Sequence, residues 1–171
     1  MTRLSSVTLL ILAGAMAALA GTPAGVFDLV SAEEAVAWNT PGAAPQEAGR
    51  QRDIGGPGMP NCHAIPATPA THPPLINIVS PTLDKPIAAP LDIDVRFVAG
   101  AAAVRPDTFK VCYVGFVIMD LTQRVTDRVA VSAEGLHVTG ADLPKGHHHL
   151  VMMIADQQGG IGTRDAVFDI K

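Results

Sequence analysis

The feature that most constrains the fold is a strict alternation of apolar and charged side chains in residues 91–97, Leu-Asp-Ile-Asp-Val-Arg-Phe. Successive side chains of a β-strand point to opposite faces, so this pattern predicts a strand with one buried face and one wet face. Such half-wet strands are typical of antiparallel sheets. The stretch therefore predicts an antiparallel β-structure.

The same reasoning predicts strands elsewhere. They fall at residues 75–79, 109–113, 128–132, 135–139, 147–155 and 163–170. Residues 114–119 are apolar on both faces, so we expect a bend at Gly115 that takes the chain to the other sheet. No segment predicts a helix convincingly. About seven short strands separated by turn signals predict an all-β protein, a single antiparallel sandwich over residues 75–171.

The first 74 residues are not expected to join this fold. Residues 1–20 have the basic, apolar and small-residue pattern of a signal peptide, although cleavage as late as about residue 35 and an uncleaved anchor stay open. The apolar run is shorter than the roughly 20 residues that cross a bilayer. Residues 37–74, rich in proline, glycine and alanine, predict a disordered arm.

Composition excludes one class of partner. The formal net charge is −4, with 16% charged residues, so the basic surface of a nucleic-acid-binding protein is not expected. Once a signal peptide is removed, no membrane span is expected either. The sequence therefore predicts a periplasmic or secreted protein.

Several stretches of the predicted sandwich share a pattern with a known family. They are Ile78-Val79-Ser80-Pro81, residues 90–97, residues 107–111, Asp120-Leu121-Thr122, residues 143–150 and Asp156-Gln157-Gln158-Gly159. With these the chain resembles bacterial immunoglobulin-like domains of the fibronectin-III-like kind. The resemblance implies a non-catalytic exported module that packs on another domain or surface, although such a fold does not by itself specify a function.

A weaker likeness is to the small periplasmic copper-carrier β-sandwiches. It rests on residues 72–75, Ser80-Pro81, residues 89–97 and the closing Phe168-Asp169-Ile170-Lys171. The resemblance implies an N-terminal histidine and an Asp-x-His motif near the final hairpin. Here Asp156-Gln157-Gln158 has no histidine, so the metal role does not carry over.

Three consecutive histidines in the predicted 147–155 strand are the sharpest local feature. His147 and His149 share one face, roughly 7 Å apart along the strand, with Met153 further along. Imidazole with a thioether suits copper, and imidazole alone suits zinc. The arm would have to supply further ligands, from His63 or His72. The alternative is an inward His148 between two solvated histidines, with no metal and no cofactor.

The chain has two cysteines, Cys62 and Cys112. In an exported protein an even count favours a disulfide, which would pin the arm to the third predicted strand. Two free thiols, or a bond from Cys62 to another protein, are the alternatives.

Two strands are more apolar than a half-wet strand should be. The excess lies in Val151 and Met153 on one strand, and in Phe116 and Ile118 on the other. Either a loop or the arm covers these side chains, or they form an exposed apolar face that binds a partner protein or a second copy.

No carboxylate pair, nucleophile motif or phosphate loop predicts catalysis, so we do not expect an enzyme. The sequence predicts an exported accessory or interaction module that binds a protein through that strand face. A periplasmic copper- or zinc-binding protein is the alternative.

Overall fold

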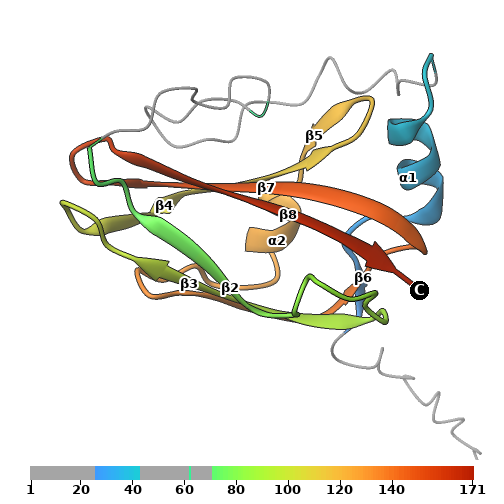
Figure 1. Cartoon of the computed structure of the whole chain (residues 1–171), viewed down its shortest axis with the longest axis horizontal. Coiled ribbons are helices and arrows are strands. Elements are labelled where there is room, and N and C mark those ends of the chain that lie inside the picture. Colours follow the sequence, from blue (N-terminus) through green and yellow to red (C-terminus); the bar gives the residue numbers. More distant parts are fainter. Residues whose placement is uncertain (1–25, 43–61, 63–70) are drawn as a thin grey trace, which may run out of the picture.

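The computed structural model describes residues 26–42, 62 and 71–171. They form a β-sandwich of two four-stranded sheets, as the sequence predicted (Figure 1). We call the sheet with strand order β1-β6-β3-β2 sheet A, and the sheet with order β5-β4-β7-β8 sheet B.

Sheet A contains the strictly alternating segment. β3 (Leu91–Val98) pairs antiparallel with β2 (Leu75–Ser80) on one side and with β6 (Gly135–Asp142) on the other. β1 (Phe27–Asp28) adds a short parallel strand to β6. Because Asp92 and Arg96 point to solvent while Val95 and Phe97 point inward, sheet A keeps one wet face.

The main strands of sheet B are longer than those of sheet A, and more of their side chains are buried. β7 (Gly146–Asp156) is its central strand and pairs antiparallel with β4 (Val104–Val114) and with β8 (Ile161–Ile170). β5 (Ile118–Asp120) folds back on β4. Residues 115–117 are therefore a turn within sheet B, and the expected crossing to the other sheet at Gly115 is wrong.

The two sheets enclose one apolar core. Val95 and Phe97 from sheet A meet Phe109, Val111 and the inward side chains of β7 and β8. The Phe97 and Phe109 rings lie 6.0 Å apart, centroid to centroid. Valine, isoleucine, leucine and methionine fill most of the remaining space, because the chain has few aromatic residues.

Two short helices were not anticipated. α1 (Ala32–Asn39) lies across the end of the sandwich at which β7 begins (Figure 1). α2 (Thr122–Thr126) follows β5, and the expected strand at residues 128–132 is absent from the structure, which has a turn and an irregular segment there. Neither α1 nor α2 is long and apolar enough to cross a membrane.

The packed region begins earlier than the expected boundary at Leu75. Phe27, Leu29, Val30 and Trp38 are at most 8% exposed and belong to the main core. The expectation that nothing before residue 75 joins the fold is therefore wrong for residues 27–39. The predicted signal peptide at 1–20, and most of the predicted arm, lie outside the described residues.

Candidate functional site

The three histidines alternate across sheet B. His148 points into the core and is 2% exposed. His147 and His149 point outward, toward two aspartates of the neighbouring β8. His147 Nδ1 lies 3.1 Å from Asp169 Oδ1, and His149 Nε2 lies 2.7 Å from Asp165 Oδ1.

These pairs are not part of a metal-binding cluster. Within the described part of the chain, no group of three or more histidine, cysteine, aspartate or glutamate side chains is placed to hold a metal ion. Met153, an expected further ligand, is fully buried beside the disulfide. His72 precedes β2 in a left-handed backbone conformation, with φ 57°, and His63 lies outside the described residues. The expected ligand set is therefore not brought together among the residues described.

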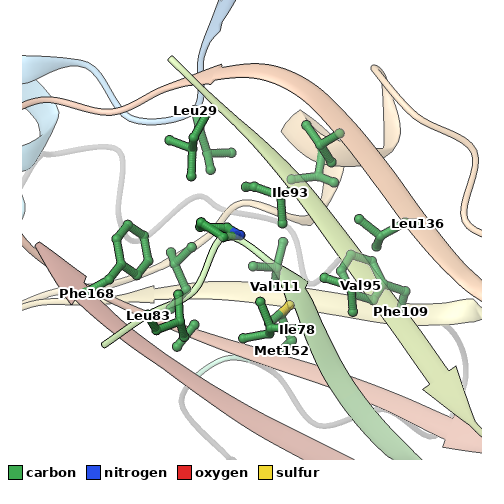
Figure 2. Close-up of a pocket in the computed structure, with 16 residues that line it drawn as sticks. Leu29, Ile78, Leu83, Ile93, Val95, Phe109, Val111, Leu136, Met152 and Phe168 are labelled. Carbon is green, nitrogen blue, oxygen red and sulfur yellow. The ribbon is translucent and has the colours of Figure 1, made fainter. Parts of the chain in front are cut away.

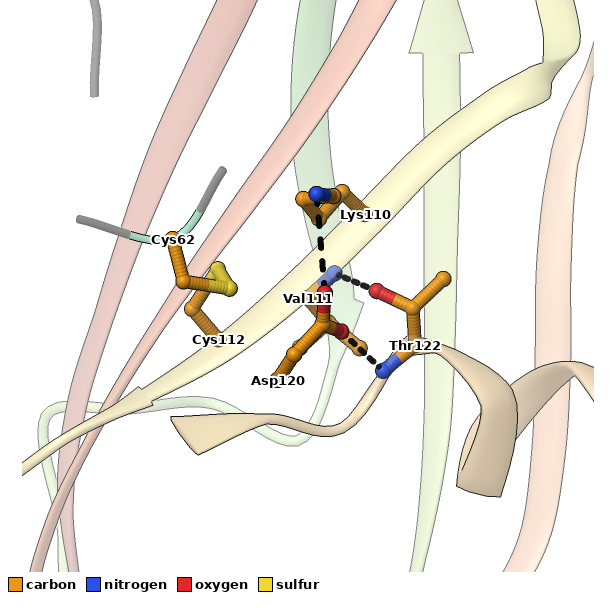
Figure 3. The surroundings of a disulfide bond; sticks show 6 residues. All are labelled: Cys62, Lys110, Val111, Cys112, Asp120 and Thr122. Atoms are coloured by element: carbon orange, nitrogen blue, oxygen red, sulfur yellow. Dashed lines mark hydrogen bonds and ion pairs between the residues drawn. A yellow bond between two sulfur atoms is a disulfide. The ribbon is translucent and has the colours of Figure 1, made fainter. Parts of the chain in front are cut away.

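The expected disulfide between Cys62 and Cys112 is present, on the outer face of β4 (Figure 3). Cys112 is fully buried, and both cysteines pack with Val151 and Met153 in a second apolar cluster. Cys62 is therefore a fixed point at which the segment before β2 is attached to sheet B.

A buried charge lies next to this cluster. The Lys110 side chain is wholly buried, and its Nζ lies 3.5 Å from Asp120 Oδ2 (Figure 3). The other oxygen of Asp120 accepts a hydrogen bond from the Thr122 backbone N–H at 2.8 Å. Because a buried ammonium is tolerated only beside a compensating charge, this pair ties β4 to β5 and to the start of α2.

The predicted interaction face is not an open face. Val151 is 3% exposed and Met153 is fully buried, so covering is the correct alternative for these two residues. Ile118 is partly buried against the same cluster. Phe116 alone is strongly exposed, at 63%, in the turn between β4 and β5. An exposed patch made of all four side chains is therefore wrong.

The space between the sheets is not a ligand site. A cavity of about 50 Å³ lies among apolar side chains that include Leu83, Ile93, Val111 and Phe168 (Figure 2). An engineered cavity that holds benzene measures roughly 150 Å³, about three times as much. The cavity is therefore a packing defect of the core.

A larger concavity lies between α1 and the start of β7, and we call it the α1–β7 groove. Its volume is about 560 Å³, which falls within the roughly 300–1,000 Å³ of small-molecule binding sites. Its lining residues are Ala32, Ala35, Val36, Asn39, Thr40, Tyr113, Pro144, Lys145, Gly146, His147 and His148. Two of the three consecutive histidines, His147 and His148, thus border the groove at the end of the sandwich where α1 lies.

The floor of the groove is a chain of hydrogen bonds. His148 Nε2 lies 2.8 Å from the Pro144 carbonyl, which only accepts, so Nε2 carries the proton. Nδ1 then accepts from the Tyr113 hydroxyl at 3.3 Å. That hydroxyl accepts in turn from Asn39 Nδ2 at 2.9 Å. The three side chains satisfy one another and connect α1 to sheet B.

Burial is the main cause of a lowered pKa at His148. Its ring packs against Tyr113 and Phe168, with centroids 5.9 and 5.8 Å away, and is removed from water. The hydrogen bond to the Pro144 carbonyl and the charge of Asp169 oppose the shift, and His147 adds to it. The lowered pKa of His148 favours the neutral ring that the hydrogen bonds require.

α1 is fixed at both ends. At its start, Ser31 and Glu34 form a capping box, each side chain bonded to the other's backbone N–H. The Glu34 carboxylate also accepts two hydrogen bonds from Arg124 of α2, at 2.8 and 2.9 Å, and these lower the pKa of Glu34 to about 2. At its end, Trp38 is buried 5.3 Å from the Tyr113 ring, centroid to centroid.

The turn between β4 and β5 also holds α1. The Val117 N–H donates to the Trp38 carbonyl at 3.0 Å. A Cβ at Gly115 would lie 2.7 Å from that carbonyl oxygen and 2.6 Å from Asn39 Oδ1, so the close approach requires glycine.

The sequence interpretation missed α1, and with it one wall of the groove. Ser31 followed three residues later by Glu34 is a helix-start signal, and it was present in the sequence. It lies after the predicted signal peptide at 1–20, in a stretch not expected to join the fold because cleavage as late as about residue 35 stayed open. Tyr113, by contrast, gave no signal, because only the fold places it beside Asn39 and His148.

Comparison with known proteins adds no identity to this geometry. No protein-family model matches the chain, and no curated protein is significantly similar to it.

Proposed function

We propose that this chain is an exported, non-catalytic module of immunoglobulin-like type that binds a segment of a partner protein in the α1–β7 groove. One observation carries the proposal: the groove is a concavity of about 560 Å³ whose rim includes Val36, a valine that is 67% exposed. Val36 shares its wall with the small side chains of Ala32 and Ala35, and binding pockets are lined predominantly by apolar side chains.

The chemistry of the groove supports binding rather than catalysis. Tyr113, His148 and Asn39 are hydrogen-bonded to one another, and the Pro144 carbonyl is occupied by His148. A general base must lie within hydrogen-bond reach of the proton that it removes from a substrate. His148 and Tyr113 are only 2% and 1% exposed, so we assign this network to holding the groove in shape.

Export is supported by the covalent chemistry of the chain. Cys62 and Cys112 form a disulfide, which persists in oxidising compartments and is rare in reducing ones. Together with the basic and apolar start of the sequence, this favours the periplasm or the exterior of the cell.

The test is site-specific photocrosslinking in producing cells. A photoreactive amino acid replaces Val36 at the groove, and in a matched variant it replaces Val79, which is 58% exposed on β2 of sheet A. We expect a crosslink from position 36 to a different protein, and none from position 79. Equal crosslinking from both positions contradicts the proposal. A crosslink from position 36 to a second copy of the chain replaces it with self-association.

A further inference from the structure

The two walls of the α1–β7 groove differ in chemistry. α1 contributes Ala32, Ala35 and Val36, which are small or apolar. The facing wall contributes Lys145 and His147, both exposed. Lys145 therefore places a positive charge on this rim, in a chain whose formal net charge is −4.

Most polar groups of the groove already have partners. Asn39 Nδ2 donates to the Ala35 carbonyl and to the Tyr113 hydroxyl, at 2.8 and 2.9 Å. The Thr40 hydroxyl donates to the Val36 carbonyl at 2.7 Å. His147 faces Asp169, as described above.

Lys145 is different. Among the described residues that line the groove with a polar side chain, it is the one with no hydrogen-bond or ion-pair partner in the part of the chain that the structure describes. Its ammonium is therefore available to an incoming anion. The two glutamates near the start of α1 do not compete for it, because Glu34 is bound by Arg124 and Glu33 is not part of the groove lining.

We propose that the groove recognises a short acidic segment of the partner polypeptide, in which a glutamate or aspartate lies next to an aliphatic side chain. The inference rests on the proposed function and names the chemistry of its partner. The aliphatic group packs on the alanines of α1 and on Val36, because small side chains let another chain approach a helix closely. The carboxylate pairs with Lys145, whose charge gives specificity and orientation.

The positive charge of Lys145 is the reason for proposing an acidic segment. A basic segment would face the like charge of Lys145, and none of the described residues that line the groove carries a carboxylate. A wholly apolar segment would leave the ammonium desolvated beside it, which is unfavourable.

The probe is a random-peptide phage library, selected against the full chain with its disulfide intact. Binding of selected peptides is then measured by fluorescence. Trp38 is the one tryptophan of the chain, and its ring lies 5.3 Å from Tyr113 on the groove floor, so its emission reports on occupancy.

Two variants and two matched controls locate the site. Lys145→Glu reverses the charge of the rim, and Lys85→Glu makes the same change at an exposed lysine that does not line the groove. Val36→Asp alters the apolar wall, and Val79→Asp is its control on sheet A. We expect peptides enriched in Asp or Glu beside Leu, Ile or Val. Lys145→Glu should weaken their binding about tenfold, and the controls should not.

The other outcomes separate the two proposals. The selected peptides could show no acidic preference and still bind more weakly to Val36→Asp. That result overturns the acidic partner and leaves the groove as a binding site. Peptides that bind all four variants as well as the wild type show that the groove is not the site. Failure to select any peptide counts against both proposals.

Discussion

The outer faces of the two sheets differ in a way that explains much of this molecule. On sheet A, outward side chains such as Asp92 and Arg96 are exposed, and the apolar Leu75 and Val79 are each 58% exposed. On sheet B, Cys112, Val151 and Met153 are at most 3% exposed on the outward face. Sheet A buries side chains on one face, whereas the central strands of sheet B bury side chains on both faces.

The difference shows which sheet the described N-terminal part of the chain packs against. Cys62 is bonded to the outer face of sheet B, and α1 closes the end of the sandwich beside Tyr113 of the same sheet. Among the described residues before β2, the two-residue β1 is the one strand added to sheet A. An all-apolar strand therefore indicates a face that another part of the chain covers, while a strictly alternating strand indicates a face left in water.

The largest effect is expected from deleting residues 1–35. Phe27, Leu29 and Val30 are at most 8% exposed, and burial of such side chains contributes about 1.5–3 kcal/mol each. Their sum approaches the roughly 5–15 kcal/mol by which whole domains are stable. A chain that begins at Val36 should therefore lack a cooperative thermal transition by circular dichroism, whereas one that begins at Gly21 should keep it. Equal melting curves would show that β1 and the start of α1 are dispensable.

The next effect compares the two outer faces directly. Met153→Ala on sheet B should lower the free energy of unfolding by about 2–5 kcal/mol, because the side chain is fully buried. Val79→Ala on sheet A, at a site 58% exposed, should change it by no more than about 0.5 kcal/mol. Guanidinium unfolding of the two variants gives both values. If the two substitutions lower the free energy of unfolding equally, the outer face of sheet B is not covered in solution.

A smaller loss is expected from removing the disulfide by Cys62→Ala with Cys112→Ala. The bond links residues 50 apart, which the chain-entropy model equates with at most about 4 kcal/mol. We expect roughly half of that, because measured disulfide contributions often fall below the chain-entropy value. Unfolding of the oxidised wild type and the double variant, with the reduced wild type as control, measures it. An unchanged midpoint would mean that sheet B is covered without the covalent link.

The smallest effect concerns His148 at the end of sheet B. Its pKa is lowered from 6.5 on folding, so the unfolded chain binds the proton more readily. The contribution of the neutral His148 ring to the free energy of unfolding is therefore present above the unfolded pKa. It is lost as the pH falls through the lower pKa of the folded state. The free energy of unfolding should decline on acidification more steeply in the wild type than in His148→Gln.

The control for this prediction is His137→Gln, at an exposed histidine on the outer face of sheet A. It should keep the slope of the wild type. If His148→Gln also keeps that slope, the buried ring does not contribute to the acid sensitivity of the fold.

The sequence by itself determined the class of fold and most of the strands. Alternation in residues 91–97 specified a half-buried strand, and turn signals separated it from its neighbours, because strand periodicity is a local property of the chain. The inward direction of His148, between two outward histidines, followed from the same period of two. The pairing of the two cysteines was also within reach of sequence reasoning.

Only the tertiary structure decided which apolar strand faces are covered and where the α1–β7 groove lies. The sequence pattern places Val151 and Met153 on one face of their strand, but it does not show whether solvent or Cys62 lies against that face. The α1–β7 groove joins residues 32–40 to residues 144–148, which are about a hundred positions apart in the sequence. Contacts at that separation depend on how the sheets pack, and no local pattern encodes them.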